Sequence, residues 1–351
     1  MEKFLTVGAL VDWCREAHPT SFSMTLKRIV EENKGLINLL ELLEEVNPCG
    51  QEYYVHKDII LITYHCELNL LSFRKNLKLK VGTRMIGMPI SISRSGILAC
   101  DEDDGELRKK VLEALTILKG LTVVLNSDIE LPGRNRTLSN YVFQNRFTGF
   151  DQYLQAMRSS YRRHLMITMQ KGQDLSFNKV APEHFTTEHY QLYQSIMERS
   201  DYPLEVLSLE FFRRYSSEIF EIRDSSGRLL AFIQMKGIGD TLHFLFCGFK
   251  REGKATGSFG DSASLYQNML LFIIKHGIEK GYKRINLGQT SAETKLKLGC
   301  VEESKYLYAR HSNSLIDAVL RRLSGSFSDK GYPTEHKVFK ADECLHGNGV
   351  V

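Results

Sequence analysis

Residues 218–248 read EIFEIRDSSGRLLAFIQMKGIGDTLHFLFCG and are the most informative stretch of the chain about its fold. Three runs of largely apolar residues are separated by two short segments, 225–227 and 237–240, that contain glycine. Alternation with a period of two is typical of strands, and short glycine-containing connections are typical of hairpins. The stretch therefore predicts three consecutive antiparallel strands over 218–224, 228–236 and 241–248.

The flanking segments extend this pattern on both sides. Upstream, the residues predict a strand at 175–180 and helices at 183–199 and 208–215. Downstream they predict a Gly- and Ser-rich loop at 253–261, a long amphipathic helix at 262–280, a strand at 284–287, a short helix and a final strand at 305–310. This order predicts a mixed α/β (α+β-like) fold, with a mixed central sheet and flanking helices.

The first half of the chain also predicts alternating helices and strands. Apolar residues recur at helical spacing in 22–45 and 101–119, whereas the segments 58–64, 85–97 and 121–125 read as strands. The turn-rich segment 128–136 marks a domain boundary. We therefore expect an N-terminal α/β domain at 1–135, a C-terminal domain at 136–323 and a flexible tail at 324–351.

Composition excludes several classes of protein. The 351 residues carry 46 Lys and Arg against 42 Asp and Glu, and a net charge of +4 is too mild for a dedicated nucleic-acid binder. Seven cysteines without a Cys-x-x-Cys pair, and histidines without a metal-binding spacing, favour reduced thiols and no metal. The most apolar run, 269–274, is far shorter than the ~18 residues of a spanning helix, so we expect a cytoplasmic protein.

The order of elements over residues 174–311 resembles the acyltransferase fold of the GNAT N-acetyltransferase superfamily. The local residues are similar to its FemAB-like, peptidoglycan-biosynthesis-related branch: Tyr266-Gln267, then GYKRINLGQ at 281–289, then Lys295 and Gly299. An aromatic-rich segment that begins at Phe150 and ends in the pair Arg162-Arg163 adds to the likeness. Together these motifs cover about half of the chain.

This resemblance implies an N-acyltransferase that moves an acyl or aminoacyl group to a small-molecule or peptide amine. The donor would be acetyl-CoA or another acyl-CoA, with aminoacyl-tRNA as the other donor of this branch. The resemblance also implies two tandem GNAT-like domains, of which the N-terminal one is a degenerate copy. A non-catalytic binding module on the same scaffold is the alternative function, and the oligomeric state is left open.

The resemblance places the donor at two adjacent segments. Backbone amides of the third meander strand would hold the acyl carbonyl, and the residues are Phe246, Cys247, Gly248 and Phe249. Gly288 and Thr290 would lie beside them, and Lys254 would approach the donor's phosphates. The loop around Lys254 is rich in glycine but out of register with the usual pyrophosphate-binding motif, which keeps aminoacyl-tRNA in consideration.

Four residues are candidates for catalysis: Gln289, Lys295, His243 and Tyr266. Gln289 would contact substrate or donor, Lys295 would hold a carboxylate or phosphate, His243 is the nearest base and Tyr266 would protonate the leaving group. Three of them have a structural alternative: Lys295 as a solvated lysine, His243 as a core or sheet-surface histidine and Tyr266 as a packed aromatic residue. Thr290 could instead form a capping box with Glu293, and Cys247 could be a small core residue.

Arg162 and Arg163 are the candidates for substrate binding, because paired guanidinium groups bind phosphate well. They belong to a basic cluster that runs from Arg158 to Lys171. A solvated helix face is the alternative interpretation of this cluster. RNA binding is a third one, against which the near-neutral net charge speaks.

Overall fold

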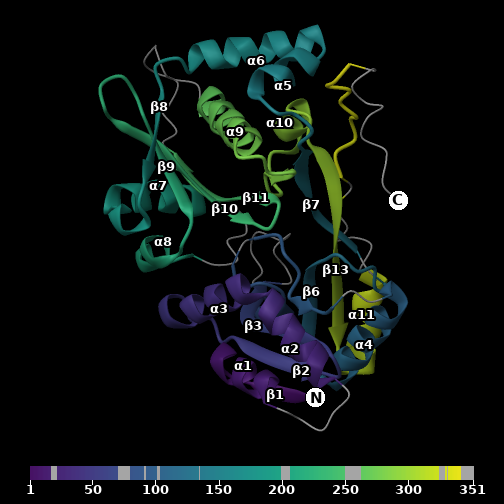
Figure 1. The fold of residues 1–351 in the computed structure, drawn as a ribbon. Helices are drawn as coiled ribbons and strands as arrows, with labels where there is room; N and C mark the ends of the chain where they lie inside the picture. The colour runs from purple at the N-terminus through teal and green to yellow at the C-terminus, as the bar shows by residue number, and fades with distance from the viewer. Residues whose placement is uncertain are drawn as a thin grey trace. The chain divides into compact units, whose positions relative to one another are not determined.

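The computed structural model describes residues 1–16, 22–69, 80–90, 92–100, 103–133, 135–198, 206–249, 262–323, 329 and 331–340. The chain divides into two compact units, coloured along the chain in Figure 1. Unit 1 comprises Met1–Leu138 and Ser304–Lys330, and unit 2 comprises Ser139–Glu303 and Gly331–Val351. The chain has a mixed α/β fold in which each unit contributes mixed sheet and helices, as the sequence predicts.

Unit 1 contains the strand order β1-β2-β3-β4-β6-β13, with β5 beside β3 and the neighbours β4 and β6 parallel. Its strands are β1 (Glu2–Phe4), β2 (Glu52–His56), β3 (Ile59–Asn69), β4 (Lys80–Ile86), β5 (Ile97–Leu98), β6 (Leu121–Ser127) and β13 (Val301–His311). Its helices are α1 (Val7–Arg15), α2 (Ser23–Glu32), α3 (Lys34–Val46), α4 (Asp104–Ile117) and α11 (Ser314–Leu323). Apolar residues of α4, such as Val111 and Leu115, pack against Val124 of β6 in the core.

Two predictions for unit 1 need correction. The predicted helix at 22–45 is two helices, because the chain breaks at Asn33 between α2 and α3. The predicted strand at 85–97 is wrong: β4 ends at Ile86, and only Ile97 and Leu98 pair again. Gly96 explains the difference, because a Cβ there would lie 2.4 Å from the backbone nitrogen of Gly87, so the chain folds back on itself.

Unit 2 contains the strand order β7-β12-β11-β10-β9-β8. Its strands are β7 (Asn135–Gln144, shared with unit 1 at its start), β8 (Ser176–Val180), β9 (Glu218–Arg223), β10 (Leu229–Ile238), β11 (Thr241–Phe249) and β12 (Arg284–Asn286). Its helices are α5 (Phe150–Ala156), α6 (Ser159–Lys171), the short 3-10 helix Pro182–His184, α7 (Thr187–Met197), α8 (Leu209–Arg214), α9 (Ser262–Glu279) and α10 (Ala292–Lys297). The predicted meander is confirmed as β9, β10 and β11, and the long helix as α9.

The strand β11 has two irregularities that define the site. It pairs with the parallel strand β12 only from Thr241 to His243, yet it continues to Phe249. Its antiparallel register with β10 shifts between Gln234 and Met235, which leaves Leu245 as an extra residue in a bulge. After His243, β11 therefore separates from β12. The backbone groups of β11 beyond His243 that face β12 form no hydrogen bonds of the ladder between these two strands.

Gly248 lets α7 pack directly on β11. A Cβ at this position would lie 2.6 Å from the backbone carbon of Leu192 and 2.6 Å from the backbone nitrogen of Tyr193. We expect Gly248→Ala to lower the free energy of unfolding by about 1–3 kcal/mol, because backbone atoms cannot move aside as a flexible side chain can. Chemical denaturation measures this change.

The matched control is Gly82→Ala in strand β4, where nothing lies within 4 Å of the added Cβ. This variant should be as stable as the natural chain or slightly more stable, because alanine restricts the unfolded chain. Equal effects of the two substitutions would contradict the packing argument.

The domain boundaries differ from the predicted ones at the C-terminal side. The chain returns to unit 1 through β13, so Ser304–Lys330 joins the first unit instead of the second. Tyr308 and Arg310 pair with Val124 and Thr122 of β6, and this ladder ties the segment to unit 1. The pairing of a strand with a partner that is distant along the chain cannot be recognised from the local sequence.

The predicted flexible tail at 324–351 also needs correction over its described part. Residues 331–340 pack on unit 2, where Val338 is buried and Phe339 pairs with Met157 as an isolated bridge. The Arg158 amide donates to the Val338 carbonyl at 2.9 Å, and the Tyr161 hydroxyl lies 3.1 Å from His336 Nδ1. Residues 341–351 lie outside the described residues.

Candidate functional site

The candidate site lies where strands β11 and β12 separate. Strand β12 ends at Asn286, and the chain then turns at Gly288, whose φ of +76° is readily adopted only by glycine. The Gly288 amide is held at 2.8 Å by the side chain of Asn286, and its carbonyl accepts from the Tyr141 amide of β7. The turn delivers helix α10 to the open side of β11.

Lys295 of α10 is the central charged residue of this opening. Its side chain is only 1% exposed, so the expectation of a solvated lysine is wrong. Its Nζ lies 5.9 Å from the centre of the Tyr141 ring and 4.0 Å from the Cβ that Gly288 lacks. Within the described chain, Nζ has neither a carboxylate nor a carbonyl oxygen as a hydrogen-bond or ion-pair partner.

Burial lowers the pKa of Lys295 from 10.5 to about 8. The thiols of Cys247 and Cys300 act in the opposite direction. Burial raises the pKa of each thiol to about 12, so both are neutral at pH 7. The site thus holds an ammonium group that is largely stripped of water and lacks an anionic partner, an arrangement that favours binding of an anion.

Tyr266 of α9 joins this group. Burial and the nearby Cys247 thiol raise the pKa of its hydroxyl, whereas a hydrogen bond with Ser291 acts in the other direction. Its ring lies 6.0 Å from that of Phe249, on the part of β11 that has left β12. The structure therefore brings Tyr266, Cys247, Phe249, Gly288 and Lys295 together, and Tyr266 keeps its proton at neutral pH.

The start of α10 differs from the alternative interpretation of Thr290. Ser291, not Thr290, is the N-cap residue, and it has a left-handed φ of +60° without a side-chain capping bond. The Glu293 carboxylate instead accepts from Lys297 at 2.6 Å. Thr290 is exposed. Gln289 is half-buried on the segment between β12 and α10, where it makes polar or ring contacts.

His243 lies on the other face of the sheet. Its cross-strand partner Lys236 reaches the backbone carbonyl of Ser216 and the Tyr215 ring at the end of α8. Paired residues of neighbouring strands share a face, so His243 points to the α8 side, away from Tyr266. Phe246 also faces that side, where it packs edge-on against Phe211 and Phe212. Only the backbone of Phe246 could therefore contact a ligand at the opening.

A cavity of about 320 Å³ lies next to α10. Its wall includes Tyr161 and His164 of α6, Gln267 and Leu271 of α9, and Thr294 and Lys297 of α10. The Gln267 side chain accepts a hydrogen bond from the Thr168 hydroxyl at 3.1 Å. Apolar walls with a few polar groups are typical of sites for small organic ligands. None of the candidate site residues from the sequence, Lys295, Arg162 and Arg163 included, is among the described residues of this wall.

Those two arginines lie on α6 beside the cavity. Arg162 is half-buried and Arg163 is exposed, and α6 begins at Ser159 because the aromatic-rich segment from Phe150 forms a separate helix, α5, that ends at Ala156. Lys254 and the glycine-rich loop around it lie outside the described residues. The phosphate contact expected at that loop therefore stays a prediction.

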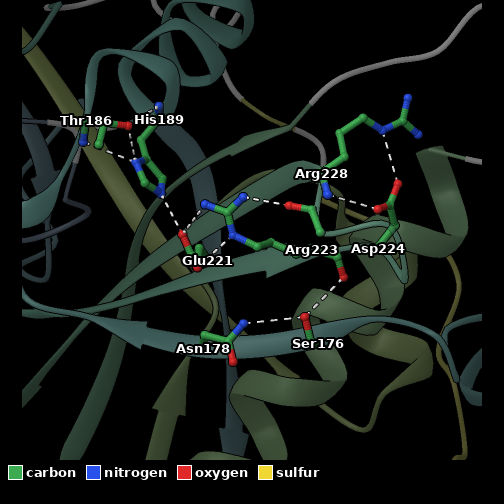
Figure 2. A network of polar contacts seen from close by, with 9 residues as sticks. Ser176, Asn178, Thr186, His189, Glu221, Arg223, Asp224 and Arg228 are labelled. Carbon is green, nitrogen blue, oxygen red and sulfur yellow. Dashed lines mark hydrogen bonds and ion pairs between the residues drawn. The ribbon is translucent and has the colours of Figure 1, made fainter.

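A second polar cluster lies on the α7 face of unit 2 (Figure 2). The Thr186 amide donates to Nδ1 of the buried His189 at 3.1 Å, and His189 Nε2 lies 3.4 Å from the Glu221 carboxylate. Arg223 binds both oxygens of Glu221 at 2.8 and 2.9 Å, and its hydrogen bonds lower the pKa of that carboxyl. Burial lowers the pKa of His189. Because these groups bind one another, the cluster ties the start of α7 to the sheet.

Two features are absent from the described residues. None of the helices there combines the length and apolar character that crossing a membrane requires. No group of three or more His, Cys, Asp or Glu side chains in the same residues is arranged to hold a metal ion.

No protein-family model and no curated protein matches the chain. Solved structures similar to it include L-PGS from Bacillus licheniformis, with 14% identity and a TM-score of 0.47 over 82% of this chain and 96% of that one. The C-terminal domain of a putative lysylphosphatidylglycerol synthetase from Agrobacterium fabrum has 12% identity and a TM-score of 0.49, covering 87% and 99%. FemX has 10% identity and a TM-score of 0.46, covering 92% and 100%.

These similarities concern the arrangement of helices and strands. From α7 to β13, the described chain has the order expected from the resemblance: two helices, a three-stranded meander, a long helix, a strand, a short helix and a strand. The order of elements and the mixed α/β fold that the sequence predicts are thus those of the described chain. Identities of 10–14% assign neither a substrate nor a residue role.

Proposed function

We propose that the chain is an N-acyltransferase that moves an acyl or aminoacyl group to an amine, with acyl-CoA or aminoacyl-tRNA as donor. The observation that carries this proposal is the buried Lys295 ammonium at the opening between β11 and β12, without an anionic partner in the described chain. Burying a charge costs free energy unless a partner compensates it. A ligand that brings an anionic or strongly polarised oxygen therefore fits this position.

In the proposed reaction the donor carbonyl lies against the backbone amides of residues 246–249. The acceptor amine attacks the carbonyl carbon, the bond to the donor's sulfur or ribose oxygen breaks, and the proton lost by the amine balances the one gained by the leaving group. Tyr266 donates the proton to the leaving group, and Lys295 stabilises the negative charge that develops nearby. Gln289, Gly288 and Thr290 would orient the donor at the turn after β12.

The cavity beside α10 is proposed to receive the donor. It is large enough for a flexible organic arm, and Lys297 and His164 offer polar contacts on its wall. Arg162 and Arg163 on the adjacent helix would meet the donor's phosphates, whether these belong to coenzyme A or to tRNA. Retention on tRNA that falls as salt rises would favour the aminoacyl donor.

The direct test is thiol release from acetyl-, succinyl- and longer acyl-CoA in the presence of a panel of amines. The proposal predicts release that depends on the amine with at least one donor, or transfer from aminoacyl-tRNA. Binding of a donor without turnover of any amine would favour the non-catalytic binding module. Absence of both binding and turnover with every donor would refute the proposal.

The pH dependence follows from Lys295. Its ammonium form predominates below a pKa of about 8 and is lost as the pH rises through that value. We therefore expect kcat/KM, which reports the free enzyme, to fall above about pH 8. The variant Lys295→Arg stays charged and, if it retains activity, should lose this fall. A kcat/KM for the natural chain that stays level or rises between pH 8 and 10 would contradict the assigned role.

A further inference from the structure

Helix α11 of unit 1 turns its apolar side outward. Leu315, Ile316 and Val319 are 78%, 47% and 55% exposed. They follow one another at positions i, i+1 and i+4, so they share one face of the helix. A surface helix normally buries such a face, and exposed clusters of large apolar side chains mark contact surfaces.

Asp317 of α11 faces its own unit instead. Asp317 is only 4% exposed, and its carboxylate accepts from the His311 amide at 3.0 Å and from Arg321 Nε at 2.9 Å. Asp317 and Arg321 are four residues apart and thus lie on one side. These hydrogen bonds fix the rotation of α11 about its own axis, and in this orientation the apolar face points outward.

Cations border this face. Ser312 exchanges two hydrogen bonds with Gly120, of 3.1 and 3.0 Å, and so places the start of α11 beside the end of α4 (Figure 1). Lys119 and the half-exposed Ile117 lie at that junction. Arg322 is exposed on the helix itself, and Asp317 is the only acidic residue of α11. The surface therefore combines an apolar stripe with positive charge.

We propose that this face of α11 docks on the surface of an anionic lipid bilayer, with the helix in the plane of the interface. Apolar residues bordered by Arg and Lys are the pattern of interfacial helices, and the charge complements anionic headgroups. Ten residues are too few to span a bilayer. One short helix face also offers much less than the ~1,200–2,000 Å² of a stable interface, which argues against a second copy as the occupant. This inference is independent of the proposed reaction.

The test uses the full chain and large unilamellar vesicles of phosphatidylcholine, with or without phosphatidylglycerol. We expect co-sedimentation with the anionic vesicles that weakens as salt rises. The double variant Leu315→Ser/Val319→Ser should weaken binding at least tenfold, and Arg322→Glu should weaken it as well. All three substitutions are on exposed positions, and circular dichroism checks the fold. Met24→Ser, an exposed apolar position on α2, is the matched control and should bind like the natural chain.

Three results would overturn the proposal. The first is no sedimentation of the natural chain with anionic vesicles at low salt. The second is equal binding of the natural chain and the double variant, which would place the membrane contact elsewhere. The third is a dimer, seen by light scattering, that dissociates in the double variant, because a second copy would then cover the face.

Discussion

Lys295→Met is expected to produce a protein that is more stable at pH 7 and at least tenfold less active. Methionine fills a similar volume without a charge, so the cost of burying the ammonium disappears. That cost is about 3 kcal/mol, from a pKa lowered from 10.5 to about 8 and about 1.4 kcal/mol per pKa unit. Activity falls because the charge that stabilises the reacting oxygen is lost.

The pH dependence of this stability difference identifies its cause. Between pH 8 and 10.5 the unfolded natural chain binds more protons at Lys295 than the folded chain does, so its stability rises with pH. The advantage of Lys295→Met should therefore be full below about pH 8 and vanish above about pH 10.5. Lys280→Met, at an exposed lysine, is the control and should change neither stability nor activity. A destabilised Lys295→Met protein would mean that the ammonium has a partner beyond those described.

Thr294→Trp is expected to weaken donor binding while the fold is kept. Thr294 is half-buried on the wall of the cavity of about 320 Å³, and an indole ring would occupy much of that space. We expect the affinity for the donor to fall at least tenfold, because the ring and the donor would compete for the same volume. Calorimetry with the donor that the natural chain binds measures this effect.

Two variants make the cavity test specific. Thr294→Ser removes one methyl group and should bind the donor like the natural chain. Thr187→Trp places the same ring on an exposed position of α7, away from the cavity, and should also leave binding unchanged. Undiminished binding by Thr294→Trp would show that the donor lies elsewhere.

The sequence predicts the meander and the long helix of unit 2 well, because their signals are local. Strands β9, β10 and β11 alternate and are separated by glycine-containing turns, and Gly281 ends the run that becomes α9. The sequence does not predict strand β7, because the start of this strand coincides with the turn-rich segment that marks the expected domain boundary. Its position in the sheet depends on pairing with the distant β12.

The burial of Lys295 is not predictable from the sequence either, because it depends on residues that are distant along the chain. Its neighbours Tyr141 and Cys247 are far away in the sequence, and a lysine on a short helix is typically exposed. Tyr266 and Cys247 pack against the same core cluster of unit 2, and their roles at the opening stay predictions from the resemblance. The alternation of a strand does not show which face of the sheet His243 occupies, and the pairing with Lys236 puts the histidine on the α8 side.

The central claim is that the opening between β11 and β12 binds an acyl donor through Lys295. Calorimetry of the natural chain and of Lys295→Met, with a panel of acyl-CoA thioesters and a stable aminoacyl-adenosine that mimics the end of aminoacyl-tRNA, tests it most directly. We predict that at least one ligand binds the natural chain with one site per chain and that Lys295→Met weakens this binding at least tenfold. Failure of every ligand to bind, or equal affinities for the two proteins, would contradict the claim.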